Sequence, residues 1–493
     1  MWRVLTSMRT ALVLLLILVL ATVPGSVFPQ RVSDELAVNE FLANNPTLGP
    51  LLDRLGMFDV FGSPWFAAIY LLLFISLLGC VIPRTAQLYR QWRDGPAQPP
   101  RRFGRRAATA TVDVADPSLA LPEAERYLRS HGWRTNHGVD WVSAEKGFLR
   151  EVGNLAFHLS MLALLVAVAV GSLLGWSGNV VVREGQGFAN TLTQYDQWNG
   201  GRAVDAGVLP PFAFTLESFT VAFERGEAQR GAPRDFDALV TLTPEPGAPA
   251  ESVRLRVNEP LRIDGADVYL IGHGYAPRVT VQAADGRTLF DDSVVFLPRD
   301  GNFTSTGVIK LPDTEPQLSF TGIFAPTATI DEGGPRSVFP APDAPGLFLS
   351  AFVGDLGLDG GEPQNVYELD TSELEQVGLE GLAPGQSWTL PDGATLTFEG
   401  VERFVALKVS HDPGRIWALL TVGLVLGGLM VSLFVPRRRI WVRHEGGRVT
   451  IAGLARTENG APAEDVRELA EALGAEPDSI GDNDSTVTEG AAG

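Results

Sequence analysis

The chain has 493 residues, a formal net charge of −19 and a single cysteine. The acidic balance argues against a nucleic acid partner, which would require a basic face. Because Cys80 is the only cysteine, a disulfide within the chain and a CxxC motif for thiol exchange are both excluded.

Four apolar runs predict a membrane protein with four transmembrane helices, because a bilayer is crossed by about 20 apolar residues in helical form. We assign the helices to residues 1–28, 65–83, 152–176 and 414–436. The first run could instead be a signal peptide, since Arg3 and Arg9 precede a leucine-rich stretch. The sequence of the run and its flanks favours an uncleaved helix.

Local signals predict where two of these helices begin and end. Ser63-Pro64 before the second helix is typical of a cap followed by proline in the first turn, and Pro83 is expected to end that helix. Before the fourth helix, Asp412 is expected to be the N-cap and Pro413 the first helical residue.

The distribution of arginine and lysine predicts the orientation in the membrane. Basic residues are concentrated in residues 84–150 and directly after the fourth apolar run. The positive-inside rule therefore places both segments, and the N- and C-termini, in the cytoplasm. Residues 177–411 would then be extracytoplasmic, and there acidic residues outnumber basic ones by more than two to one.

The shorter connecting segments contain different kinds of pattern. Residues 29–64 are expected to be an extracytoplasmic loop of short amphipathic helices on the membrane surface, broken at Pro46 and Pro50. Residues 84–150 are expected to form a basic linker and a small α/β module. Its expected elements are a strand at Ala110–Val114, a helix at Leu121–Ser130 and two short strands near Trp133 and Trp141–Ala144.

Residues 177–411 alternate apolar and polar residues between frequent turn signals, which predicts a large all-β domain of sandwich or barrel type. The expected strands include Phe212–Leu216, Ser252–Val257, Asp267–Ile271, Arg278–Ala283, Ser293–Leu297, Leu347–Val353 and Thr395–Phe398. Residues 437–493 are expected to form a hairpin at Trp441–Ile451 that turns at Gly446-Gly447, a short helix at Ala463–Leu473 and a disordered acidic tail.

His158 is the strongest candidate for a functional residue, because it lies inside the third apolar run. Ionisable residues within membrane spans commonly mark a ligand, a proton path or a buried pair. Asn154 precedes it by four residues and so shares its helical face. Two interpretations remain open: a hydrogen bond from the imidazole to a neighbouring helix, or coordination of a metal or haem.

The other histidines have weaker contexts. His273 lies between two glycines at the end of a predicted strand, where an exposed residue in a tight turn is the alternative to a ligand. His411 would lie at the outer membrane surface, as an interfacial polar group or a cofactor contact. His131 and His137 are expected in surface loops.

Without a P-loop, GxSxG, HExxH or dinucleotide motif, we expect a chain that is not an enzyme by itself.

Several short motifs, in this order and topology, resemble the ResB (CcsB) family of system II cytochrome c maturation. The motifs span residues 8 to 445 approximately. They are Ser63-Pro64-Trp65-Phe66, Gly79-Cys80-Val81-Ile82-Pro83-Arg84, Gly153-Asn154, Phe157-His158-Leu159-Ser160, Val257-Asn258-Glu259-Pro260-Leu261, Gly272-His273-Gly274-Tyr275-Ala276-Pro277 and Asp412-Pro413-Gly414.

The resemblance implies a non-catalytic subunit of a complex in the bacterial plasma membrane that handles haem b. Its partner would be a ResC (CcsA) protein carrying the tryptophan-rich WWD motif, which this chain lacks. His158 would supply one axial ligand to haem iron within the membrane, opposite a histidine of the partner. The acceptor would be an apocytochrome c with a CxxCH motif, kept reduced by a thioredoxin-like protein.

The resemblance leaves other contacts to haem as candidates, namely His273, His411, Asn154 and Arg150. His158 lies about six residues, or roughly 9 Å, from the cytoplasmic end of its span. A haem taken from the inner leaflet would then place its propionates near Arg150 and Lys146.

Two rival functions are a membrane-anchored scaffold or sensor that binds a protein or peptide without cofactor, and a di-haem cytochrome b. The second rival conflicts with the single histidine inside the spans.

Overall fold

The computed structural model describes residues 2–31, 35–101, 108–113, 117–205, 207, 209–263, 265–357, 369–445, 447–455 and 462–474. Val114 of the predicted strand, Gly446 of the predicted hairpin turn and the predicted acidic tail after residue 474 lie outside these ranges. The chain forms two compact units, Met1–Val170 together with Gly414–Gly493, and Gly171–Pro413.

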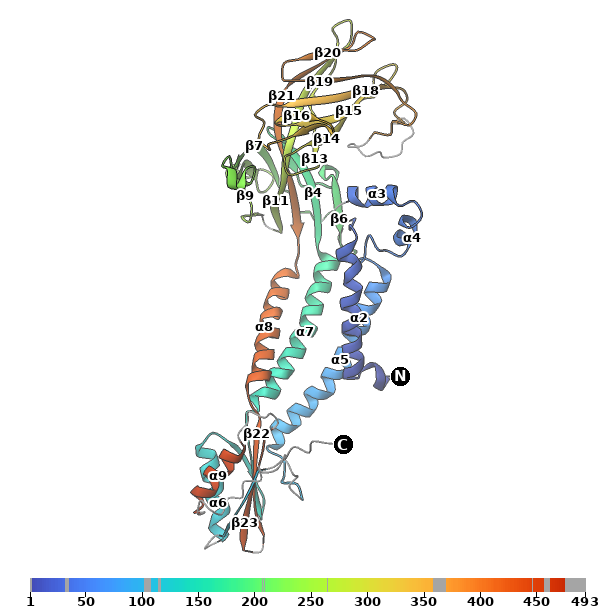
Figure 1. Ribbon diagram of the computed structural model, residues 1–493. Coiled ribbons are helices and arrows are strands. Elements are labelled where there is room, and N and C mark those ends of the chain that lie inside the picture. The colour runs from blue at the N-terminus through green and yellow to red at the C-terminus, as the bar shows by residue number, and fades with distance from the viewer. Residues whose placement is uncertain are drawn as a thin grey trace, which may run out of the picture. The chain divides into compact units, whose positions relative to one another are not determined.

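In the described part of the chain, four helices are long and apolar enough to cross a membrane (Figure 1). They are α2 (Met8–Val27), α5 (Pro64–Asp94), α7 (Leu149–Leu174) and α8 (Arg415–Phe434). Ser63 begins α5 as predicted: its hydroxyl accepts a hydrogen bond from the Phe66 amide, and Pro64 lies in the first turn. Short helices α1 (Trp2–Leu5), α3 (Glu35–Asn44) and α4 (Gly49–Arg54) flank α2 and precede α5.

Two predicted helix boundaries are wrong. Helix α5 continues through Pro83 and ends at Gly95, whose φ of 75° lies in the left-handed region. A proline inside a helix removes only one backbone hydrogen bond, so it does not always stop the helix. Helix α8 begins at Arg415, and its N-cap is Gly414, not Asp412. The Asp412 carboxylate instead lies over Gly171, where an added Cβ would be 2.5 Å from its Oδ1.

The first unit also contains a small α/β domain that is made from two separated stretches of chain. Its antiparallel sheet has the order β1 (Ala108–Asp113), β23 (Arg448–Ala455), β22 (Arg438–Glu445), β3 (Trp141–Lys146) and β2 (Arg134–His137). Helices α6 (Pro117–Ser130) and α9 (Pro462–Ala472) pack on this sheet around a common apolar core. The pairing of the two stretches was not predicted, because strands that pair across more than 300 residues leave no local signal in the sequence.

A buried ion-pair network connects this domain to helix α7. Arg437, just before β22, donates to Glu145 of β3 at 2.9 Å and to Glu151 of α7 at 3.0 Å. Arg437 and Glu145 are 6% and 3% exposed, so the two charges compensate one another away from water.

The second unit is β-rich, as predicted. Its strands are β4 (Trp176–Arg183), β5 (Gly187–Ala189), β6 (Gln197–Gly200), β7 (Ala213–Phe223), β8 (Pro233–Thr243), β9 (Glu251–Arg256), β10 (Leu261–Ile263), β11 (Ala266–Gln282), β12 (Thr288–Ser293), β13 (Leu297–Pro298), β14 (Ser305–Leu311), β15 (Leu318–Ala325), β16 (Ala328–Asp331), β17 (Gly334–Ser337), β18 (Gly346–Val353), β19 (Glu375–Leu382), β20 (Ser387–Thr389) and β21 (Thr395–His411).

Two long antiparallel strands, β11 and β21, run through both cores of this unit. One end of the pair packs against the sheet β5-β7-β8-β9, and the other end packs against the sheet β13-β14-β15-β18-β19. The ladder is irregular at Ile271 in β11 and at Glu399 in β21. Each of these extra residues shifts the alternation of buried and exposed side chains in its own strand by one residue. Each shift allows the same strand to place even-numbered side chains in one core and odd-numbered ones in the other.

The predicted turn at His273 is therefore wrong. Asp267–Ile271 and Arg278–Ala283 were expected as two strands, but they lie in the single strand β11, and His273 pairs with Val405 in mid-ladder. The flanking glycines suggested a turn, but the irregularity in the strand is a bulge at Ile271. Gly274 is needed because a Cβ there would be 2.4 Å from the Phe404 ring, so the close approach involves the chain itself.

Candidate functional site

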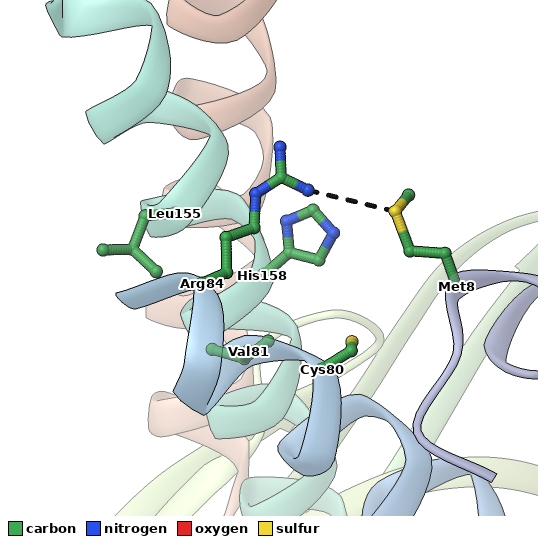
Figure 2. Close-up of a pocket in the computed structure, with 6 residues that line it drawn as sticks. All are labelled: Met8, Cys80, Val81, Arg84, Leu155 and His158. Atoms are coloured by element: carbon green, nitrogen blue, oxygen red, sulfur yellow. Dashed lines mark hydrogen bonds between the residues drawn. The ribbon is translucent and has the colours of Figure 1, made fainter. Parts of the chain in front are cut away.

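His158 faces a small cavity where three helices meet. The cavity has a volume of about 90 Å³ and is lined by Met8 of α2, by Cys80, Val81 and Arg84 of α5, and by Leu155 and His158 of α7 (Figure 2). Cys80 and Val81 share a face of α5 with Arg84, since Arg84 follows them by four and three residues. Leu155 and His158 share a face of α7 for the same reason.

Apolar packing between α5 and α7 fixes this arrangement. Leu77 and Val81 of α5 and Leu162 of α7 are buried together, next to the cavity. One turn further along, the Tyr70 hydroxyl of α5 donates to the carbonyl oxygen of Leu165 in α7. Both contacts lie C-terminal to His158 along α7, so they fix α5 against α7 next to the imidazole.

The hydrogen bond of His158 determines its tautomer. Nδ1 lies 2.7 Å from the backbone carbonyl oxygen of Asn154, one turn earlier in α7. A carbonyl can only accept a hydrogen bond, so Nδ1 carries the proton in this contact. In the neutral ring, Nε2 then has a free lone pair, and this is the tautomer of a metal-ligating histidine whose other nitrogen is oriented by a carbonyl.

The Phe157 ring orients the imidazole from the side, with centroids 5.1 Å apart and planes at 88°. This edge-to-face contact is favourable and restricts ring rotation. Within the described ranges, no group of three or more histidine, cysteine or carboxylate residues could hold a metal ion.

Asn154 belongs to the interface between α7 and α8 more than to the cavity. Its Nδ2 lies 3.4 Å from the Ser432 hydroxyl, while its Oδ1 is buried without a hydrogen bond in the described part of the chain. The two helices approach closely here. A Cβ on Gly428 would lie 2.7 Å from the Phe157 amide nitrogen, and one on Gly153 would lie 2.9 Å from the Ser432 amide nitrogen.

The cation beside His158 is Arg84, which the sequence analysis did not select as a site residue. Arg150, the predicted one, lies in the first turn of α7 and does not line the cavity. Its Nη1 is buried without a hydrogen bond among the described residues. Lys146 donates to the His131 carbonyl at 3.0 Å, within the α/β domain.

His273 lies in an aromatic cage in the β-rich unit. Its ring is stacked on Phe303 at 4.6 Å and contacts Phe219, Phe236 and Phe223 at 5.2, 5.4 and 6.1 Å. Nδ1 is buried without a hydrogen bond in the described residues. Burial, with a smaller contribution from the charge of Arg403, lowers the pKa of His273 to about 4.

His411 ends β21 and stacks on Trp176, with centroids 6.3 Å apart; Trp176 stacks in turn on Trp198 at 5.3 Å. His273 and His411 are not brought together. The pairing partner of His273 is Val405, six residues before His411, which corresponds to about 20 Å along a strand. The candidate residues of the β-rich unit therefore do not form one site.

Comparison with known proteins identifies the family. A model of the ResB-like family matches residues 8–467. The chain belongs to the ResB-like family. Its curated relatives include the proteins named "Cytochrome c biogenesis protein CcsB" of Synechococcus sp. strain RCC307, 26% identical over 481 residues and 94% of both chains, and of strain WH7803, 29% identical over 467 residues, covering 92% of this chain and 93% of the relative.

A third CcsB relative, from Prochlorococcus marinus strain NATL1A, is 23% identical over 461 residues, which cover 92% of this chain and 93% of the relative. These ResB-like relatives therefore match almost from end to end, including the apolar helices and the β-rich unit. Together with the four apolar helices, the match indicates a membrane protein.

Proposed function

We propose that this chain is the haem-handling subunit of a cytochrome c maturation complex. With a ResC (CcsA)-type partner, it would take haem b across the bacterial plasma membrane and present it to apocytochrome c for covalent attachment. The end-to-end match to proteins named for cytochrome c biogenesis supports the pathway. Haem is the cargo in this proposal, and the chain itself has no catalytic role.

The tautomer of His158 supports the choice of haem ligand. Its Nδ1 proton is committed to the Asn154 carbonyl, so the free lone pair of Nε2 is available to iron. The bound iron would supply the coordination bond. The protein's own part is to orient the ring through Asn154 and Phe157 and to keep the imidazole between apolar helices.

The size of the cavity supports a shared site. About 90 Å³ is far smaller than a porphyrin, so this chain does not enclose haem by itself. A haem coordinated by His158 would lie against the helices and leave its opposite face for a histidine of the partner.

The positive-inside rule supports the direction of transport. Under this proposal both termini and the α/β domain are cytoplasmic, and the β-rich unit is extracytoplasmic, where it would help to position the reduced apocytochrome. Entry from the cytoplasmic side would bring haem first to the end of the membrane near His158.

Maturation of c-type cytochromes in cells tests the proposal. Cells producing the His158→Ala chain at native level are expected to lose most covalently bound haem on a haem-stained gel, with the variant still present in membranes. His131→Ala, on the exposed surface of the α/β domain, is the matched control and should mature cytochromes normally. Normal maturation with His158→Ala would contradict the proposal and favour a scaffold without cofactor.

A further inference from the structure

Arg84 is the cationic residue of the His158 cavity. It lies four residues after Cys80 on α5, and its side chain and the imidazole of His158 line the same small space (Figure 2). The Arg84 side chain is exposed on the surface of this chain, so its guanidinium lies at the mouth of the cavity.

Within the described part of the chain, the guanidinium of Arg84 forms few hydrogen bonds with its five N–H donors. Its one hydrogen bond there is from Nη1 to the Met8 sulfur, at 4.0 Å. A thioether is a weak acceptor, and no carboxylate in the described ranges forms a salt bridge with Arg84. A charge with so weak a partner retains most of its capacity to bind an anion.

We infer that Arg84 binds a carboxylate of the molecule that His158 coordinates, so that the two residues form a two-point site. This inference rests on the proposed function, in which that molecule is haem b. A haem carries its two propionates on one edge of the ring, to the side of the iron. An iron ligand and an anion-binding residue must therefore border the same space, as His158 of α7 and Arg84 of α5 do.

Arg84 suits this role better than Arg150 does. The guanidinium of Arg84 is at the cavity mouth, whereas Arg150 does not line the cavity. Arginine is also the side chain that binds a carboxylate through two parallel hydrogen bonds, which fixes orientation as well as charge. The role of Arg84 is thus to determine which edge of the haem ring faces its guanidinium.

A lipid phosphate at the membrane surface could offer the same anionic chemistry to Arg84. The two sources differ in what they predict for haem. If Arg84 serves a lipid, removing its charge changes the response to lipid headgroups but leaves haem affinity and its dependence on propionates intact.

The test compares haem b with haem dimethyl ester, in which both propionates are uncharged. The full-length chain, alone and with its partner, is titrated by Soret absorbance in phosphatidylcholine nanodiscs and in nanodiscs that also contain phosphatidylglycerol. The wild type is expected to bind haem b about ten- to a hundredfold more tightly than the ester, as for a hydrogen-bonded charge pair. Arg84→Gln should abolish that difference, and Arg84→Lys should restore part of it.

Arg90→Gln is the matched control. Arg90 is an exposed arginine on the same helix, six residues further along, and it does not line the cavity. It should keep the wild-type preference for haem b. An esterification penalty as large in Arg84→Gln as in the wild type would overturn the inference, whichever lipid is used. Absence of a Soret band from the wild type with both ligands would instead overturn the proposed function, and the inference with it.

Discussion

His158 and His273 both lie away from bulk water, but their hydrogen bonding differs. Nδ1 of His158 is paired with a carbonyl, whereas Nδ1 of His273 is buried without a hydrogen bond in the described residues. The first ring has a defined tautomer and a free lone pair on the other nitrogen. The second is an imidazole kept neutral by an aromatic cage, which makes it costly to protonate rather than ready to bind.

The caged imidazole predicts an acid-sensitive β-rich unit. The pKa of His273 is about 4 when folded and near 6.5 when unfolded, so the unfolded chain binds the proton more readily. The stabilising contribution is complete above about pH 6.5 and falls as the pH approaches 4, by up to about 3 kcal/mol.

Chemical denaturation of the full chain between pH 7 and pH 4 would measure this loss. His273→Phe should show a smaller loss than the wild type, because it lacks the titrating ring while carboxylates contribute equally to both proteins. Equal pH dependence of the two chains would contradict the assignment.

The sequence was sufficient to select His158 but not to select Arg84. A histidine inside an apolar run is unusual by itself, so it is recognised without knowing its neighbours. Arg84 lies after a proline that was expected to end the helix, among other arginines, and in sequence it resembles any residue of a basic flank. Its role became visible only when α2, α5 and α7 met around one cavity.

At the scale of secondary structure elements, α7 and α8 contact one another through small residues. Gly428 of α8 faces the backbone of α7 at Gly153 and Phe157, whereas an added Cβ on its neighbour Gly427 would meet nothing within 4 Å. Two adjacent glycines thus have opposite packing situations on one helix, which provides a matched pair for mutation.

Gly428→Val is expected to force α7 and α8 apart and to lower stability by about 1 to 3 kcal/mol, as is typical of overpacking. Gly427→Val changes the same residue type and the same helix propensity without a clash, so its effect should be much smaller. Thermal unfolding in detergent, followed by circular dichroism, would compare the two variants. Similar unfolding midpoints would show that the close approach does not contribute to stability.

Strands β11 and β21 show why part of the fold was not predicted. Alternation correctly indicated β-structure near Asp267 and Arg278, but each bulge reverses which parity is buried. A reversal of parity in a single sequence looks like a turn between two strands. The turn at His273 was suggested by its flanking glycines, although Gly274 accommodates the ring of Phe404.

At the scale of the whole molecule, the α/β domain is built from strands that are adjacent in sequence to three of the long helices. β1 follows α5, β3 precedes α7 and β22 follows α8, and all three strands belong to one sheet. The central strands β22 and β23 come entirely from the C-terminal stretch. The stretch between α5 and α7 therefore cannot complete its own sheet, which the sequence, taken segment by segment, could not reveal.

Removal of the chain after Pro436 is expected to unfold the remaining part of this domain, because β1 would lose its partner β23 and β3 would lose β22, leaving only the β2–β3 pair. Limited trypsin digestion with mass spectrometry should then show rapid cleavage at Arg126 and Arg129 of α6, which the full chain resists. Ile451→Asp, which places a charge in the fully buried core, should have a similar effect at full length. Unchanged protection in both variants would contradict a shared domain.

The absorbance spectrum of the purified chain with its partner tests the haem-ligand assignment most directly. The wild type and the control His131→Ala should retain a Soret band, whereas His158→Ala should lose most of it. His158→Gly should recover part of the band when imidazole is added, because the free ligand occupies the place of the missing ring. A full Soret band in His158→Ala, unaffected by imidazole in His158→Gly, would show that this histidine does not bind the iron.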